Sequence, residues 1–188
     1  MQDLTEESLQ SEQLVDGALL KVYRDAVRLP DGGESVREWI DHPGASAVVP
    51  LLENGKTLLL RQFRYPPRKV FLEVPAGKLD RKGENPEDVA RRELEEETGW
   101  KAERFVHLGS LHPCIGYSNE LIHFYLAEGL SKGTQDLSEG EFVEVVAMGF
   151  DEAVARARRG EVLDMKSTVA LLMADLHVRG RIDPDPQP

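Results

Sequence analysis

Cysteine is nearly absent from this chain, since Cys114 is the single cysteine among 188 residues. One thiol cannot form an intramolecular disulfide, and it disfavours a metal site built from thiolates. This composition suits a reducing compartment, and we expect a cytoplasmic protein.

Long hydrophobic runs and a secretory signal are also missing. No apolar run approaches the roughly 18 residues that a membrane helix requires. The N-terminus, MQDLTEESLQSEQL, is acidic and has neither the basic nor the apolar region of a signal peptide. With 40% hydrophobic residues and a mean hydropathy of −0.39, the chain is expected to be soluble and to bury a core. Its length suits one domain with a short attachment.

Positive charge is scarce, because 23 Lys and Arg residues stand against 34 Asp and Glu residues and give a net charge of −11. Such a field repels nucleic acid, so a nucleic-acid processor is disfavoured. A small anionic ligand can still bind where a divalent cation and a few arginines reverse the local charge. We expect a small-molecule ligand, and neither nucleic acid nor a membrane as partner.

The two ends and an N-terminal segment differ from the rest of the chain. Residues 1–14 are polar and residues 181–188 are rich in Pro and Asp, so both ends are expected to fray. Residues 18–40 alternate apolar and polar side chains around a Pro-Asp-Gly-Gly turn, which is typical of an antiparallel ribbon. We therefore divide the chain into a tail and β-ribbon at 1–42, a main domain at 43–180 and a flexible tail.

The main domain alternates strand and helix patterns. Residues 45–64 hold two Val- and Leu-rich runs around an Asn54-Gly55 turn, which predicts two consecutive strands of a central sheet. Because strands and helices follow one another, we expect an α/β fold. Further strands are expected at 105–111, 121–128 and 142–148, and helices at 86–98, 151–159 and 166–178.

The helix expected at 86–98 carries a cluster of carboxylates. A proline near its first position and a glycine just past its end mark both boundaries. Glu93, Glu96 and Glu97 stand at positions i, i+3 and i+4, so they project from one face and repel one another. An acidic helix face is usually only solvated surface. A divalent cation would neutralise this one, and carboxylates are preferred ligands of Mg²⁺ and Mn²⁺.

A longer pattern surrounds this cluster and favours the metal site. Ala76-Gly77, Glu84 and the run RELEEETGW at 92–100 resemble the Nudix box, a Gly-containing loop that leads into a helix ending in R-E-U-x-E-E-x-G-U, where U is apolar. The stretch KLDRKG between Gly77 and Glu84 is one residue longer than the family pattern has. This insertion leaves the spacing of the helix glutamates unchanged. It bears instead on the loop and on Glu84, which would cap the helix or pair with an arginine.

The resemblance implies a fold and a set of metal ligands. The expected fold is a Nudix α/β/α sandwich with a mixed central sheet and an N-terminal antiparallel β-ribbon. The expected activity is a pyrophosphohydrolase that uses Mg²⁺ or Mn²⁺. Glu93, which is also expected to be catalytic, and Glu97 would be metal ligands. Glu96 would bind the metal directly or through water, and Ala76 would offer its backbone carbonyl. Arg92 would orient the glutamates through hydrogen bonds.

Segments around the box resemble the branch of ADP-ribose pyrophosphatases and nucleotide-sugar hydrolases. These segments are VREWIDHPGASAVVP, LLLRQFRYP, FLEVPAGKLD and HPCIGYSNELIHFYLAEGL. In this branch Arg37 and Arg64 would bind the substrate, because a guanidinium donates two hydrogen bonds to a diphosphate. A surface salt bridge is the alternative for each arginine. Glu73 would face the ribose or the metal cluster, and relatives lead us to expect a homodimer formed with the N-terminal ribbon.

An acidic loop, Ser138-Glu139-Gly140-Glu141, precedes the strand expected at 142–148. It resembles the loop from which this branch supplies a late carboxylate. We predict that Glu139 is the general base that takes a proton from the attacking water, and that Glu141 assists metal binding. An exposed acidic turn is the alternative interpretation.

The favoured reaction is hydrolysis of ADP-ribose to AMP and ribose 5-phosphate, or of a nucleotide sugar such as GDP-mannose. The alternatives are a Nudix hydrolase of nucleoside triphosphates, coenzymes or capped nucleotides, and a non-catalytic Nudix module that senses ADP-ribose. A non-catalytic module would be expected to lose box glutamates, whereas all three are present. We expect structural roles for Cys114, His112, His123 and Trp39, with His112 and Tyr117 bordering the pocket.

Overall fold

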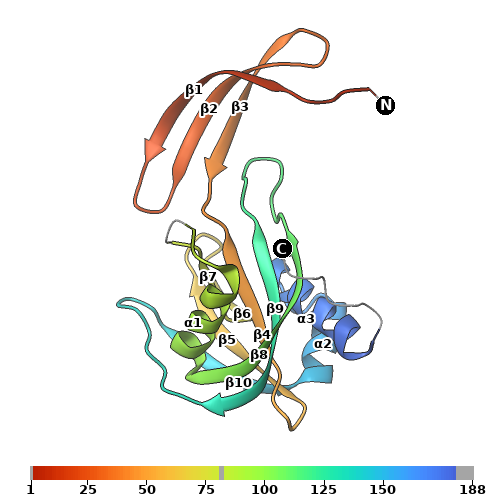
Figure 1. Ribbon diagram of the computed structural model, residues 1–188. Helices are drawn as coiled ribbons and strands as arrows, with labels where there is room; N and C mark the ends of the chain where they lie inside the picture. The colour runs from red at the N-terminus through yellow and green to blue at the C-terminus, as the bar shows by residue number, and fades with distance from the viewer. Residues whose placement is uncertain (1, 81–82, 181–188) are drawn as a thin grey trace. The chain divides into compact units, whose positions relative to one another are not determined.

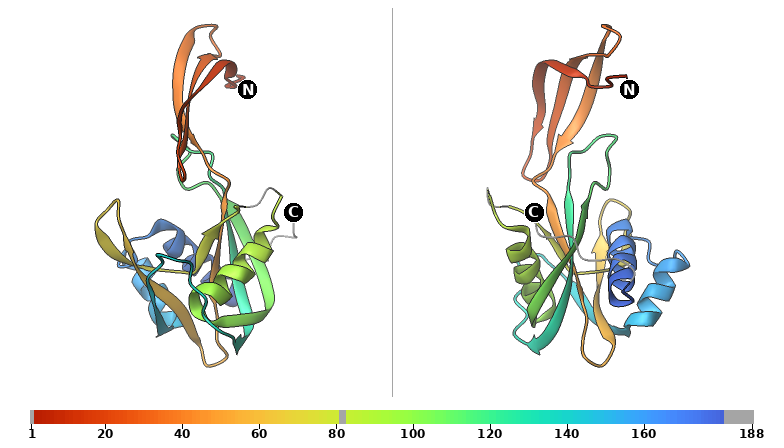
Figure 2. Two further views of the ribbon diagram at one scale, coloured as in Figure 1. Left: turned by 90° about the vertical axis from the view of Figure 1, so that its left-hand side faces the viewer. Right: turned by 45° about the vertical axis from the view of Figure 1, so that its right-hand side comes forward.

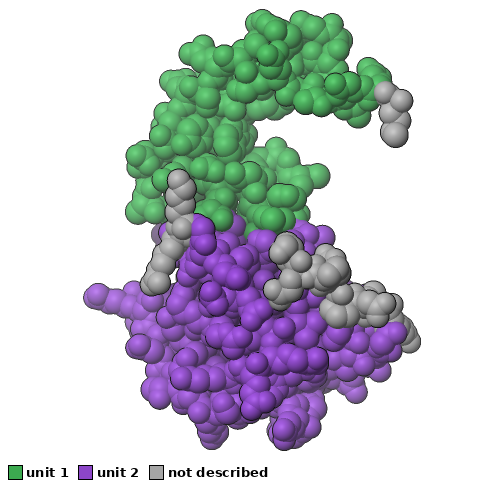
Figure 3. Space-filling model, viewed as in Figure 1, with its two compact units in different colours: residues 1–43, 112–121 green, residues 44–111, 122–188 purple. Residues whose placement is uncertain are grey.

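The computed structural model describes residues 2–80 and 83–180, and the tail expected at 181–188 lies outside them. The chain divides into two compact units, one of residues 1–43 and 112–121 and one of residues 44–111 and 122–188 (Figure 3). None of the helices in the described residues is long and apolar enough to span a membrane.

The first unit contains a three-stranded antiparallel sheet in the order β1 (Glu7–Asp16), β2 (Lys21–Arg28), β3 (Glu34–Asp41) (Figure 1). The predicted turn joins β2 to β3, with Gly32 at a φ of 85°. The prediction that residues 1–14 fray is wrong for residues 7–14, which belong to β1. Pairing with β2 supplies partners for the backbone of this polar strand, so it needs no apolar side chains to form.

The described residues of the second unit form two sheets and three helices, arranged as in Figure 1. A mixed four-stranded sheet has the order β7-β4-β9-β8, with a parallel β4–β9 pair, and an antiparallel three-stranded sheet has the order β10-β5-β6. The elements are β4 (Ala45–Pro50), β5 (Lys56–Arg64), β6 (Lys69–Glu73), β7 (Ala76–Lys78), α1 (Pro86–Thr98), β8 (Trp100–Leu111), β9 (Ile122–Lys132), β10 (Val143–Gly149), α2 (Phe150–Arg158) and α3 (Met165–Val178).

The strands and helices predicted for the main domain are present, and β6 and β7 are additional to them. One prediction about their arrangement is wrong. The strands on either side of the Asn54-Gly55 turn, β4 and β5, do not share one central sheet. Each lies inside its own sheet with both edges paired to other strands. Across the turn, the chain is joined by the bridge between Leu51 and Thr57 and by a hydrogen bond of 2.8 Å from the Leu52 N–H to the Lys56 carbonyl.

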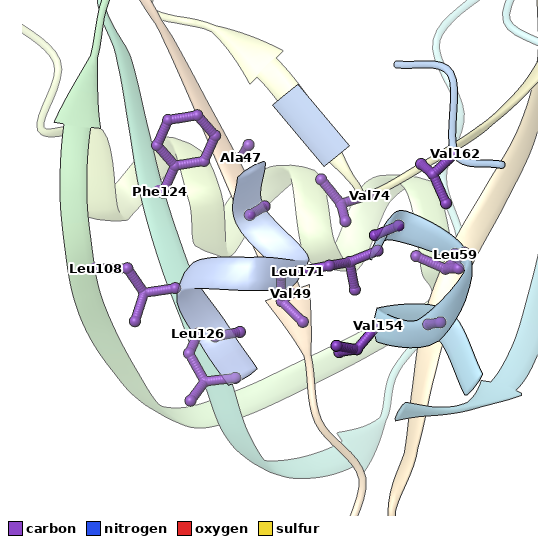
Figure 4. Packing of buried hydrophobic residues seen from close by; sticks show 14 of the residues in the cluster. Ala47, Val49, Leu59, Val74, Leu108, Phe124, Leu126, Val154, Val162 and Leu171 are labelled. Atoms are coloured by element: carbon purple, nitrogen blue, oxygen red, sulfur yellow. The ribbon is translucent and has the colours of Figure 1, made fainter. Parts of the chain in front are cut away.

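Helices cover both faces of the four-stranded sheet, with α1 on one side and α2 and α3 on the other (Figure 2). Strand β4 contributes to both cores. Ala47 and Val49 pack with Leu171 of α3 (Figure 4), whereas Val48 packs with Leu94 of α1. This explains why β4 reads as a continuous buried run without polar alternation. The result is the α/β/α sandwich that the resemblance implied.

Candidate active site

Helix α1 presents the predicted carboxylates beside the start of β7. Its ends form as predicted, because the side chain of Asn85 accepts a hydrogen bond from the Glu87 N–H and Gly99 ends the helix at a φ of 71°. Glu97 is buried at 5% exposure, and its Oε2 accepts a hydrogen bond of 2.9 Å from the backbone N–H of Ala76. The structure therefore brings Ala76 and Glu97 together.

Gly77 makes room for Glu93. A Cβ atom added at Gly77 would lie 1.9 Å from Oε1 of Glu93, a distance that no real contact reaches. A side chain on the loop would therefore displace the carboxylate. The φ of Gly77 is not in the left-handed region, so the backbone conformation does not demand a glycine here. The close approach of the Glu93 side chain favours one.

Arg92 holds two of the three glutamates. Its Nη1 donates hydrogen bonds of 2.7 Å to Glu93 and 2.9 Å to Glu96, and its Nε lies 3.9 Å from an oxygen of Glu84. Glu84 thus pairs with an arginine, while Asn85 caps the helix. The hydrogen bonds expected of Arg92 are present, and they orient carboxylates without contact to a reacting atom.

Negative charge accumulates around Glu97. The pKa of Glu97 is raised to about 8, chiefly by burial and also by the charges of Glu93 and Glu141, against the opposing Ala76 hydrogen bond and the ammonium of Lys166. Burial also raises the pKa of Glu93, with contributions from Glu96 and Glu141 against the charge of Arg92. Glu141 of the acidic loop therefore acts electrostatically on the carboxylates of α1.

This donor set fits a divalent cation. A hard cation with oxygen ligands would offset the charge that raises these pKa values, and carboxylates are the donors that Mg²⁺ prefers. In the described part of the chain no three carboxylate or imidazole groups yet converge on one point. The reason is that Glu93 and Glu96 bind Arg92, while Glu97 binds the Ala76 N–H.

The segment at 133–141 carries the acidic loop and is anchored to the C-terminal end of α1. Nε2 of Gln135 donates a hydrogen bond of 2.7 Å to the carbonyl of Glu97, and the Asp136 N–H donates one of 3.0 Å to the carbonyl of Glu96. These bonds satisfy carbonyls that a helix end leaves free. Sequence reasoning missed Gln135, because no local pattern distinguishes a loop glutamine that caps a distant helix.

The two glutamates of the loop differ in their surroundings. The Ser138 N–H donates a hydrogen bond of 3.2 Å to Oε2 of Glu141, and the Glu141 N–H donates one of 3.0 Å to the Ser138 carbonyl. This turn directs Glu141, whose charge reaches Glu93 and Glu97. Glu139 and Glu141 are both exposed, so the hydrogen bond from Ser138 and the charge effect on α1 distinguish Glu141.

Arg64 and Glu73 bind each other. Nε and Nη2 of Arg64 each donate a hydrogen bond of 2.8 Å to the Glu73 carboxylate, which is 3% exposed. The ammonium of Lys166 contacts the same carboxylate and lies 2.7 Å from Asp164. Sequence reasoning missed Lys166 and Asp164. The available signal was an aspartate just before an apolar helix, because Asp164 is the N-cap of α3.

The remaining predicted residues lie in the first unit or on the strands. Arg37 belongs to the first unit and binds Glu6 through hydrogen bonds of 2.9 and 2.5 Å. Trp39 stacks on Tyr23 with ring centroids 5.2 Å apart and donates a hydrogen bond to Asp25. The other three residues have the following partners: Nδ1 of His112 contacts the Glu120 carbonyl, Nδ1 of His123 contacts the Ser110 hydroxyl, and the carbonyl of Cys114 accepts hydrogen bonds from the N–H groups of Tyr117 and Ser118.

Comparison with known proteins agrees with this geometry. Residues 41–171 match the NUDIX domain, and residues 6–40 match the nucleoside diphosphate sugar hydrolase N-terminal domain. The ADP-ribose pyrophosphatase of Bacillus subtilis (strain 168) is 39% identical over 173 residues, which are 91% of this chain and 93% of the relative. A GDP-mannose pyrophosphatase of Yersinia enterocolitica is 36% identical over 162 residues, 79% of this chain and 84% of the relative.

A solved structure shares the fold. The crystal structure of an ADP compounds hydrolase superposes with a TM-score of 0.82 at 20% identity, over 97% of this chain and 100% of the other. The mixed α/β fold with its N-terminal antiparallel sheet is thereby confirmed. From these matches and the carboxylate helix, the chain belongs to the Nudix hydrolase family, in the branch of ADP-ribose pyrophosphatases and nucleoside diphosphate sugar hydrolases.

Proposed function

We propose that this protein hydrolyses the pyrophosphate bond of a nucleoside diphosphate linked to a sugar, with ADP-ribose as the favoured substrate and AMP and ribose 5-phosphate as products. The observation that carries the proposal is the complete carboxylate cluster of α1, packed against the Ala76-Gly77 loop. Intact box glutamates favour an enzyme over a non-catalytic module. The N-terminal match, to a domain of nucleoside diphosphate sugar hydrolases, favours this substrate class over nucleoside triphosphates.

The α1 carboxylates would hold the metal. Glu93, Glu96 and Glu97 are the proposed ligands of Mg²⁺ or Mn²⁺, with Glu141 and the Ala76 carbonyl assisting. When bound there, the cation would screen the charge of the diphosphate and lower the pKa of a water. Arg92 would keep the glutamates oriented until the metal takes its place among them.

Residues outside the metal cluster would bind the substrate and deprotonate the attacking water. Arg64 and Arg37 are proposed to bind the diphosphate or the adjoining ribose through bidentate hydrogen bonds. Glu139 is proposed to take the proton of the attacking water, which requires the exposed turn at 138–141 to close over the site. Glu141 lies in the same turn and is the rival base, since its charge already acts on Glu93 and Glu97.

A homodimer is proposed through the N-terminal sheet. The described residues of this sheet form no buried apolar cluster, and Leu9, Leu14 and Val36 expose between 38% and 55% of their surface. A second copy would cover such side chains. Sedimentation at several protein concentrations tests this proposal.

A substrate panel with Mg²⁺ decides the function. We expect ADP-ribose to be cleaved with the highest kcat/KM among ADP-ribose, GDP-mannose, other nucleotide sugars and nucleoside triphosphates. Mass spectrometry of the products separates the candidates, because AMP with ribose 5-phosphate requires cleavage between the two phosphates. Preferred release of pyrophosphate from a triphosphate, or binding of ADP-ribose without turnover, would contradict the proposal.

A further inference from the structure

Glu73 is a buried carboxylate with two cationic partners instead of one. It is 3% exposed, accepts both hydrogen bonds of a bidentate contact with Arg64, and also contacts the ammonium of Lys166. Burial alone would raise the pKa of Glu73, but the hydrogen bonds and charges of Arg64 and Lys166 outweigh it and lower the pKa. Glu73 therefore stays ionised inside the fold.

The two cations differ in their freedom to move. The side chain of Lys166 is 16% exposed and is held between Glu73 and Asp164, which also accepts a hydrogen bond of 3.1 Å from the Ser167 N–H at the start of α3. The side chain of Arg64 is 44% exposed at the end of β5. Lys166 is thus the fixed partner of the carboxylate, and Arg64 is the accessible one.

This difference matters because a buried carboxylate that loses its last partner is strongly destabilised. If Arg64 were the only cation on Glu73, movement of Arg64 to a substrate phosphate would leave the buried carboxylate unpaired and destabilise the fold. With Lys166 in place, Glu73 keeps an ion pair when Arg64 departs. One α1 carboxylate already acts on Arg64: the pKa of Arg64 is raised first by the Glu73 hydrogen bond, and the charges of Glu73, Asp164 and Glu97 raise it as well.

We infer that Lys166 is a positioning residue that releases Arg64 from Glu73 to bind the diphosphate of the substrate. This rests on the proposed function, in which Arg64 is a substrate ligand. Lys166 does not touch substrate in this scheme. Lys166 acts through Glu73. Removal of Lys166 would make Arg64 the only counterion of this buried carboxylate and would keep the guanidinium on Glu73.

A suppressor experiment tests this role by steady-state kinetics with ADP-ribose and Mg²⁺. Lys166→Met should raise KM by about 10- to 100-fold, the range expected for lost charge-assisted hydrogen bonds, with a smaller change in kcat. Glu73→Gln removes the charge that retains Arg64, so the double variant Lys166→Met with Glu73→Gln should recover a KM near that of Glu73→Gln alone. Lys166→Arg keeps a cation and should also restore KM.

The controls separate positioning from damage to the fold. Lys56→Met removes an exposed lysine at the opposite end of β5 from Arg64 and should leave KM unchanged. If Lys166→Met does not fold, the double variant and Lys166→Arg still carry the comparison. An unchanged KM in folded Lys166→Met, or a double variant no better than Lys166→Met, would overturn the inference. Absence of wild-type turnover on the whole panel would instead refute the proposed function.

Discussion

The N-terminal sheet and the α/β/α sandwich are stabilised in different ways. In the sandwich, apolar clusters lie on both faces of the four-stranded sheet and contain fully buried Leu, Val and Ala side chains. In the N-terminal unit, over the described residues 2–43 and 112–121, Val27 is the one hydrophobic side chain that is buried. Exposed ion pairs such as Arg24 with Glu38 connect its strands, and such pairs contribute little.

The two units therefore meet different physical requirements. A small sheet needs an apolar face covered by another surface to be stable, whereas the sandwich buries its own. The carboxylates need the rigidity of the sandwich, because metal ligands must be held within narrow geometric limits. We therefore expect catalysis to depend on the sandwich and association to depend on the N-terminal sheet.

The largest effect should come from removing the metal. We expect excess chelator to reduce turnover to background and Mg²⁺ or Mn²⁺ to restore it, because the α1 carboxylates lose the cation that screens the diphosphate. Chelator should leave the sedimentation behaviour unchanged, since the N-terminal sheet holds no part of that cluster. Full activity in chelator would contradict metal dependence, and dissociation would contradict the division between units.

The next effect concerns the loop glutamates of the sandwich. Glu139→Gln should lower kcat by about 10²–10⁴-fold, because an amide cannot accept the proton of water, while the Mg²⁺ titration stays near wild type. Glu141→Gln is the matched comparison and should mainly weaken Mg²⁺ affinity. A large loss of kcat in Glu141→Gln, with wild-type kcat in Glu139→Gln, would assign the base to Glu141.

A pair of glycine substitutions compares the units directly. Gly77→Ala should lower kcat by roughly 100-fold, because the new Cβ displaces Glu93 and a misplacement of about 1 Å has effects of that size. Gly116→Ala is the control in the N-terminal unit, where nothing lies within 4 Å of an added Cβ. Equal kcat in both variants would show that Glu93 tolerates the displacement.

The two predicted substrate arginines also come from different units. Arg64→Ala should raise KM by about 10- to 100-fold and Arg37→Ala by roughly tenfold, with little change in melting temperature. Arg104→Ala removes an exposed arginine paired with Glu128 and serves as the control. A KM effect from Arg64 alone would confine substrate binding to the sandwich, and none from either would remove both from the site.

The smallest effect is a pH dependence of stability in metal-free protein. The pKa of Glu97 is raised from 4.5 to about 8, so the folded state binds more protons than the unfolded state between these values. This contribution is full below about pH 4.5 and is lost as the pH rises through about 8. In chelator, the melting temperature should therefore fall more from pH 6 to pH 9 in wild type than in Glu97→Gln. Identical pH profiles would contradict the burial of an ionisable Glu97.

Sequence reasoning succeeded where local spacing determines structure. The bounds of α1 and the common face of Glu93, Glu96 and Glu97 follow from helical periodicity and from capping residues at either end. It failed at residues 7–14, because a polar strand is recognisable only through the partner strand that satisfies its backbone. It also placed β4 and β5 in one sheet, because a short turn does not reveal which strands will occupy the remaining edges.

The family, the mixed α/β fold and the helix that carries the carboxylates could be predicted from sequence, because these depend on residues close together in the chain. Two further contacts required the fold to be known: Lys166 shares Glu73 with Arg64, and Gln135 caps the end of α1. Lys166 and Glu73 are separated by 93 positions, and Gln135 and Glu97 by 38. Such pairs form only when folding brings distant segments together, and burial then decides which charges must have a partner.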